Sequence, residues 1–290
     1  MYLHTDPSAG HDILDSAEYY TSREDTRALI ASPGIARQIG QRGLNRLIDL
    51  GPGDVSAFRN KIVPLVRIFS PSEYVAVDFS NHILAPVTAY CRSQFPDMAV
   101  RTIQCDFFRA PGRIPAADSS LIVILGNTFG DYPYYSRGSF PTRHFARFLR
   151  ALKRGRDVNS ALLISVDTNQ FENSILHSYS GTATQLFFRK SLDWLALNAP
   201  RYSHIISHLI PQVAFDQLAN CIVFSLYNTS EYVLPVPNTT NCIRPRSSFV
   251  IGVSYRFTEV QLSEICTLAR LNICAQQIAP GGTTRLLLIA

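Results

Sequence analysis

The chain has 290 residues, of which 46% are hydrophobic and 17% are charged, and its formal net charge is +5. This composition provides for a sizeable buried core and excludes a largely disordered chain. The basic residues are spread out except for RFLRALKRGR (147–156), which we interpret as the polar face and C-terminal end of a helix. No aromatic-basic interleaving or finger motif accompanies that group, so we do not expect a nucleic-acid partner.

Six cysteines show no C-x-x-C spacing, and several lie in apolar segments, where a free thiol behaves as a small hydrophobic group. We find neither a signal peptide nor an apolar run of 18 residues. The sequence therefore predicts a reduced, cytoplasmic protein without a membrane anchor. His204 and His208 have the i,i+4 spacing of a metal pair, but no glutamate lies between them and no third ligand is evident, so we predict no metal site.

The predicted elements begin with a helical cap over residues 1–40. From residue 41 to 170, apolar runs alternate with helical periodicity, in the order RLIDLG, SAFRNKIVPLVRIF, YVAVDFS, HILAPVTAYCRSQF, AVRTIQCDFF, SLIVILGNTFG, TRHFARFLRALKR and SALLISVDT. Continuously apolar strands are typical of parallel strands that are covered on both faces. The alternation predicts a doubly wound, mostly parallel, Rossmann-like α/β sheet.

After residue 170 the pattern loosens. Helical segments at 171–178 and 183–198 precede the β-rich runs NCIVFSLYNTSEYVLPV and SSFVIGVSYRF. We interpret residues 171–256 as a smaller α+β region that covers the substrate at the carboxyl edge of the sheet. Residues 257–290 are expected to return to that sheet as a helix and a strand.

Four successive strands of the predicted sheet end in residues that suit a nucleoside ligand. The four strand ends are Asp49-Leu-Gly51-Pro-Gly53, Asp78, Asp106-Phe107 and Gly126-Asn127-Thr128. Ligands of open α/β sheets sit at the carboxyl ends of the strands, near the point where the strand order reverses. We therefore expect these residues to meet at one site.

Each strand end suits a different part of a nucleoside. Glycines let the backbone approach a ligand closely, and Asp78, about 25 residues beyond the glycine turn, is placed to accept both hydroxyls of a ribose. Asp106 is placed to accept an exocyclic amine while Phe107 packs on a purine. Taken singly, Asp78 also fits a helix N-terminus and Phe107 also fits the core. Ser56 stands where a dinucleotide fingerprint needs its third glycine, so S-adenosylmethionine is the expected cofactor.

These motifs resemble the histidine-specific, S-adenosylmethionine-dependent N-methyltransferases of ergothioneine biosynthesis and their relatives, over nearly the whole chain. EYYTSRED (18–25) is similar to the family's E-Y-Y-x-x-R-x-E segment, and DLGPG is similar to D-L-G-S-G. SYSGTATQLFF (178–188) resembles a shortened Tyr-Asp…Gly-Val-Thr segment, and GVSYRFT (252–258) resembles E-x-S-x-K-F. The resemblance implies a class I methyltransferase fold with a small-molecule substrate.

The resemblance also implies two sets of site residues. The cofactor contacts would come from Tyr19, Gly51, Gly53, Asp78, Asp106, Phe107, Gly126 and Asn127. The substrate pocket would contain Tyr2, Thr128, Asp131, Tyr179 and Ser254. Asp131 and Tyr179 are the catalytic candidates, with Asp131 orienting or deprotonating an ammonium group and Tyr179 beside it.

Three departures from the family pattern concern the substrate. The family's asparagine for the amino-acid head group is Asp131 here, its glutamate for the imidazole ring is Gly252, and its lysine after the glycine turn is Ala57. We therefore predict a small amine or amino-acid-like acceptor other than histidine. Two alternatives remain: an enzyme that cyclises the cofactor's methionine moiety or transfers its aminocarboxypropyl group, and a non-catalytic binding protein.

Overall fold

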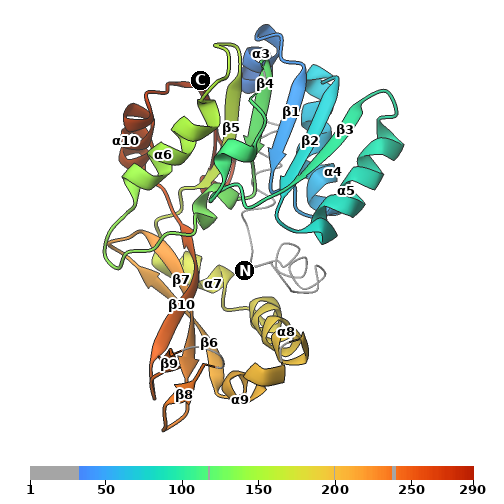
Figure 1. Ribbon diagram of the computed structural model, residues 1–290. Coiled ribbons are helices and arrows are strands. Elements are labelled where there is room, and N and C mark those ends of the chain that lie inside the picture. Colours follow the sequence, from blue (N-terminus) through green and yellow to red (C-terminus); the bar gives the residue numbers. More distant parts are fainter. Residues whose placement is uncertain (1–32, 117, 199, 237–239) are drawn as a thin grey trace.

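A seven-stranded sheet forms the centre of the protein in the computed structural model, which describes residues 33–116, 118–198, 200–236 and 240–290 (Figure 1). The strand order is β11-β12-β5-β4-β1-β2-β3. The strands are β1 (Arg46–Leu50), β2 (Glu73–Asp78), β3 (Ala99–Gln104), β4 (Ser120–Ile124), β5 (Ala161–Asp167), β11 (Ile273–Ile278) and β12 (Thr284–Ile289). Strands β1 to β5 are parallel, whereas β12 runs antiparallel to both β5 and β11.

Helices cover both faces of this sheet and so explain the continuously apolar strands. Successive strand residues point to opposite faces: Leu47 packs in one core and Ile48 in the other. The helices on the Leu47 side are α3 (Pro33–Gln41), α4 (Val55–Phe69) and α5 (Asn81–Gln94). On the opposite side, α6 (Thr142–Lys153) packs beside α10 (Glu259–Ala269). The predicted doubly wound α/β sheet is confirmed.

The strand order reverses between β1 and β4. The chain moves outward from β1 through β2 to β3, then returns to β4 on the other side of β1. The carboxyl ends of β1 and β4 therefore border the crevice in which ligands of open α/β sheets bind.

A second, antiparallel sheet with the order β10-β7-β6 projects from this edge (Figure 1). It consists of β6 (Leu209–Asp216), β7 (Cys221–Asn228) and β10 (Ser248–Tyr255). It is accompanied by α7 (Glu172–Ser178), α8 (Thr182–Asn198), α9 (Ser203–Ile206) and a small ribbon of β8 (Leu234–Pro235) and β9 (Cys242–Ile243). Strand β10 contacts η2 (Thr128–Asp131), the single turn after β4, so the second sheet is anchored at the carboxyl edge of the first.

Three details differ from the sequence-based expectation. The C-terminal segment adds two strands instead of one, because ICAQQI (273–278) forms the edge strand β11. Strand β6 was also not predicted. Helix α3 packs on α4 and β11, so residues 33–41 belong to the core domain; the remainder of the expected cap, residues 1–32, lies outside the described residues. Within the described ranges, no helix has the length and apolar character that crossing a bilayer requires.

Candidate active site

The glycine turn after β1 brings three strand ends together. Gly51 and Gly53 have φ angles of +77° and +69°, in the left-handed region that favours glycine. A Cβ atom on Gly51 would lie 3.1 Å from Cγ2 of Thr128 and 3.8 Å from Cζ of Phe107. The ends of β1, β3 and β4 therefore converge around Gly51, where the main chain is bare.

Asp49 lies beneath this turn and faces the protein interior. It is fully buried, and its Oδ2 accepts a hydrogen bond of 2.9 Å from the Tyr74 hydroxyl. Burial raises the pKa of the Asp49 carboxyl to about 7, although the Tyr74 hydrogen bond and the charge of Lys61 lower it. These contacts give Asp49 a structural role between β1 and β2.

Asp78 ends β2 and precedes α5. Its Oδ1 accepts a hydrogen bond of 2.8 Å from the amide of Ser80. Ser80, and not Asp78, is the N-cap residue of α5. Desolvation raises the pKa of Asp78 to about 6, while the amides of Ser80 and Phe79 lower it. The carboxyl is mostly ionised at neutral pH and lies two strand positions from β4, at the same edge as Gly51.

Asp106 and Phe107 follow β3. The Asp106 carboxylate accepts hydrogen bonds from the amides of Phe108 (3.1 Å) and Arg109 (3.2 Å), and its side chain is 41% exposed. Phe107 is buried, with its ring centroid 4.7 Å from that of Phe108. The acid thus faces outward at the crevice while the ring beside it belongs to the core.

The turn after β4 ties the two sheets together. Gly126 has a φ of +77°, and its amide donates to the Ser165 hydroxyl at 2.9 Å. The buried Asn127 side chain accepts from the Asp167 amide at 3.0 Å and donates to the Ser254 hydroxyl at 3.1 Å. Both ends of this side-chain amide are therefore engaged in linking β5 to β10.

Asp131 lies at the end of the same turn, near Ser254 and Arg256. Desolvation raises the pKa of Asp131 to about 6, while Ser254 and the charge of Arg256 lower it. With a pKa near 6, the Asp131 carboxyl is mostly ionised at neutral pH.

Arg256 stands at the centre of this region, although the sequence reasoning did not select it. Its Nε lies 2.8 Å from Oδ2 of Asp167, and the two side chains are 1% and 0% exposed. Nη1 donates to the Ser254 hydroxyl at 3.1 Å, and Nη2 donates to the Tyr179 hydroxyl at 3.3 Å. The signal was present in SYRF (254–257), where Arg256 stands at the lysine of the resembled E-x-S-x-K-F segment.

The structure thus joins Asn127, Tyr179 and Ser254, three of the predicted site residues, through Arg256 and Asp167. Asp131 lies nearby, at the end of the η2 turn. Tyr2 and Tyr19 lie outside the described residues. Gly252 lies in β10 opposite Phe224, next to a register shift. As a glycine, it brings no side chain to either face of this strand.

Two other residues were considered as replacements for the glutamate that Gly252 lacks. Asn228 is buried; its side chain donates to the Arg244 carbonyl at 2.9 Å and accepts from the Ser230 amide at 2.9 Å. Glu231 forms an ion pair of 2.7 Å with Arg246, and its side chain is 80% exposed. Both residues are engaged in local contacts after β7.

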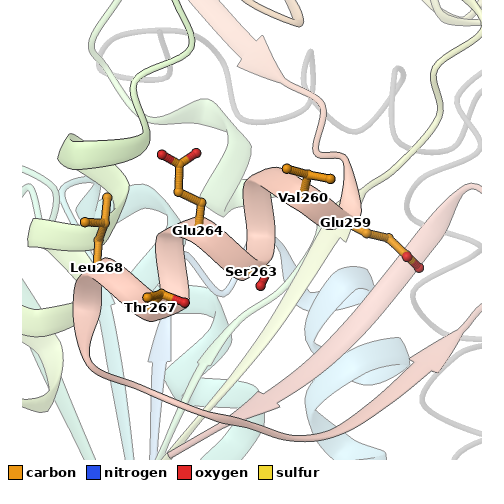
Figure 2. A pocket seen from close by; sticks show the side chains of 6 residues that line it. All are labelled: Glu259, Val260, Ser263, Glu264, Thr267 and Leu268. Atoms are coloured by element: carbon orange, nitrogen blue, oxygen red, sulfur yellow. The ribbon is translucent and has the colours of Figure 1, made fainter.

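The other candidate features lie apart from this cluster. His208 makes a 3.0 Å hydrogen bond with the Tyr232 hydroxyl, and the residues that the structure describes contain no group of three metal-ligating side chains. A surface hollow is lined by Glu259, Val260, Ser263, Glu264, Thr267 and Leu268. Figure 2 shows that all six side chains come from α10, and none of them belongs to the predicted site.

Comparison with known proteins gives a family match over most of the chain. The model of the family described as "Histidine-specific methyltransferase, SAM-dependent" matches residues 11–290. A histidine N-alpha-methyltransferase from Mycolicibacterium smegmatis is 24% identical over 180 residues, which are 61% of this chain and 53% of that protein. The matched region thus spans about half the length of this relative.

Solved structures are more remote. The CcbJ methyltransferase from Streptomyces caelestis is 8% identical with a TM-score of 0.48, over 91% of this chain and 88% of the other. An S-adenosylmethionine-bound amino pentose methyltransferase from Micromonospora echinaspora is 9% identical with a TM-score of 0.44, over 97% and 95% of the two chains. The fold assignment therefore rests on the strand order described above.

Proposed function

The chain belongs to the family of histidine-specific, S-adenosylmethionine-dependent methyltransferases, and from this premise we propose that it methylates the nitrogen of a small amine or amino-acid-like acceptor. One observation carries the proposal. The bare turn at Gly51 lies against Thr128, and the same η2 turn that contains Thr128 ends in the ionised Asp131. A place for a nucleoside and a place for an amine are thus separated by a single turn.

The residues of the crevice fit S-adenosylmethionine. Gly51 and Gly53 allow a left-handed turn without side chains beside the crevice, the Asp78 carboxylate at the end of β2 is the acceptor for two ribose hydroxyls, and Asp106 lies at the next strand end. When bound, the cofactor supplies an electrophilic methyl group on a positively charged sulfur. The protein's part is to align the attacking nitrogen with that methyl group and to exclude water.

Asp131 is the group that this chain offers to the attacking amine. An ionised carboxylate attracts an ammonium group and orients it. The attacking nitrogen must then lose a proton, and a carboxyl with a pKa near 6 serves as its acceptor in the site or passes it to water. Ser254 lies near this carboxyl and lowers its pKa. The neighbouring Tyr179 offers a ring face and a hydroxyl to the methylated product cation.

We further propose that histidine is not the preferred acceptor. A pocket that hydrogen-bonds an imidazole nitrogen discriminates strongly for that ring, because a buried polar group otherwise stays unpaired. Gly252 provides no such partner, and the two candidates for its replacement, Asn228 and Glu231, are engaged elsewhere. Asp131 also repels a substrate carboxylate that an asparagine would accept, so the head group of a plain zwitterion is held less well.

The activity is tested by incubating the purified protein with S-adenosylmethionine, alone and with a panel of amines and amino acids. Acceptor-dependent release of adenosylhomocysteine supports methyl transfer. Methylthioadenosine that accumulates without an acceptor would instead show chemistry at the methionine moiety. Cofactor binding in calorimetry without either product would show a non-catalytic binder.

Competition within the same panel tests the acceptor class. Histidine is expected to be turned over at least tenfold less efficiently than the best acceptor, as judged by kcat/KM. A tenfold preference for histidine would overturn the interpretation of Gly252 and Asp131 and leave the methyltransferase activity itself unaffected.

A further inference from the structure

Arg256 and Asp167 form a buried ion pair whose outer face is directed to the proposed acceptor pocket. Asp167 is the last residue of β5, and its Oδ1 accepts a 2.8 Å hydrogen bond from the Asn169 amide while Oδ2 faces Nε of Arg256. The carboxylate therefore holds one edge of the guanidinium in a fixed orientation. The other edge reaches Ser254 and Tyr179, which were predicted from the sequence as pocket residues.

The hydrogen-bond directions around Ser254 follow from this arrangement. Its hydroxyl oxygen accepts one N–H from Arg256 Nη1 and another from Asn127 Nδ2, both at 3.1 Å. With two donors directed at the oxygen, the hydroxyl proton points away from both of them. Arg256 and Asn127 thus fix the direction in which Ser254 can donate a hydrogen bond of its own.

The same reasoning applies to Tyr179. Its hydroxyl oxygen accepts from Arg256 Nη2 at 3.3 Å, so the phenolic proton points away from the guanidinium. The guanidinium carbon also lies 5.9 Å from the centroid of the tyrosine ring. The planar guanidinium group of Arg256 donates to the Ser254 and Tyr179 hydroxyls at the same time and so orients both. A lysine ammonium group at this position does not reproduce that geometry.

Gly130 shows that the surrounding chain is built around this network. A Cβ atom there would lie 2.7 Å from Asn127 Nδ2 and 2.7 Å from the Tyr255 carbonyl oxygen. Such contacts are too short for any side chain, so the η2 turn passes close to the network only because residue 130 is glycine. An ion pair that served stability alone would be replaceable by packed apolar side chains and would not need this close fit.

We propose that Arg256 is a positioning residue for the acceptor: held by Asp167, it fixes the Ser254 and Tyr179 hydroxyls. This inference rests on the proposed function, because the pocket that it organises is the proposed acceptor pocket. It assigns no role to Arg256 in cofactor binding.

The test compares Arg256→Lys with Arg285→Lys. Arg285 is a matched control, because it is also buried, in strand β12 of the large sheet, and is paired with a carboxylate, Glu259. Arg256→Lys is expected to lower kcat/KM for the acceptor at least tenfold, mainly through KM. Both variants should bind adenosylhomocysteine within threefold of wild type in calorimetry.

A second readout needs no turnover. In protein labelled at the tyrosine ζ carbon with ¹³C, the Tyr179 resonance, assigned with Tyr179→Phe, is expected to move in Arg256→Lys and to stay in place in Arg285→Lys. If no acceptor is turned over by the wild type, the proposed function fails, and this resonance still decides whether Arg256 orients Tyr179. An unmoved resonance would overturn the positioning role whatever the activity.

Tyr179→Phe keeps the ion pair and covers the case in which Arg256→Lys does not fold. It should reproduce the rise in acceptor KM by about fivefold or more, with adenosylhomocysteine affinity unchanged. In the double variant, the two effects on kcat/KM should be less than multiplicative, because both changes remove one contact. Multiplicative effects, or an unchanged acceptor KM in Tyr179→Phe, would contradict the proposal.

Discussion

Replacing Asp49 by asparagine should stabilise the protein above neutral pH. Burial raises the Asp49 pKa from 3.8 to about 7, and this difference of roughly 3 pH units corresponds to about 4 kcal/mol at about 1.36 kcal/mol per unit. Because the folded-state pKa is the higher one, the folded protein binds more protons between these two values. Its free energy of unfolding therefore falls as the pH rises from about 4 to about 7.

Asparagine removes this cost because it is neutral at all these pH values and keeps an oxygen for the Tyr74 hydroxyl. Part of the gain is lost, since Lys61 is also buried and its charge stabilises ionised Asp49. We therefore expect Asp49→Asn to be about 2–3 kcal/mol more stable than wild type at pH 8 and close to it near pH 4.

The assay is urea unfolding of both proteins from pH 4 to 8.5 without ligand, followed by circular dichroism. Subtracting the two pH profiles isolates Asp49 together with its charge interaction with Asp78, since carboxyls that do not interact with Asp49 contribute equally to both. Adenosylhomocysteine affinity should stay within threefold, because the Asp49 side chain faces Tyr74 beneath the turn. Parallel pH profiles, or a variant that is less stable at pH 8, would refute the reasoning.

Three further predictions concern the cofactor crevice. Asp78→Ala should weaken adenosylhomocysteine binding about a hundredfold, or roughly 2–3 kcal/mol. Wild-type affinity should also decline below the Asp78 pKa of about 6, since the acceptor for two hydroxyls is then protonated. Native-like affinity of Asp78→Ala in calorimetry, with an intact fold, would contradict the role of Asp78 in binding the ribose. Asp106→Ala should weaken binding less and reduce discrimination against the inosine analogue, and unchanged discrimination would count against its role. Gly51→Ala should weaken binding at least tenfold, because its Cβ would lie 3.1 Å from Thr128. Gly43→Ala is the control for Gly51→Ala, because Gly43 also has a positive φ (+61°) but an added Cβ would meet no atom within 4 Å. It should cost only about 1–2 kcal/mol of stability.

The sequence alone determined the central sheet and where its crevice lies. Strands β1, β2, β4 and β5 are buried on both faces, so their apolar runs are continuous and stand out from the helical periodicity between them. Because these strands are parallel, their carboxyl ends lie at one edge. This is why Gly51, Asp78 and Asp106 could be placed at that edge without any knowledge of long-range contacts.

The tertiary structure decided what the sequence pattern does not encode locally. Strands β6 and β11 alternate between partly buried and exposed residues. Their sequences therefore lack the continuous apolar run that identifies a fully buried strand. The pKa of Asp49 depends on how completely α4 and β2 enclose it. The ion pair of Arg256 and Asp167 joins two residues that are 89 positions apart in the sequence. Such a pair has no periodicity of its own, because burying two charges is favourable only where folding brings both to one place and supplies their hydrogen bonds.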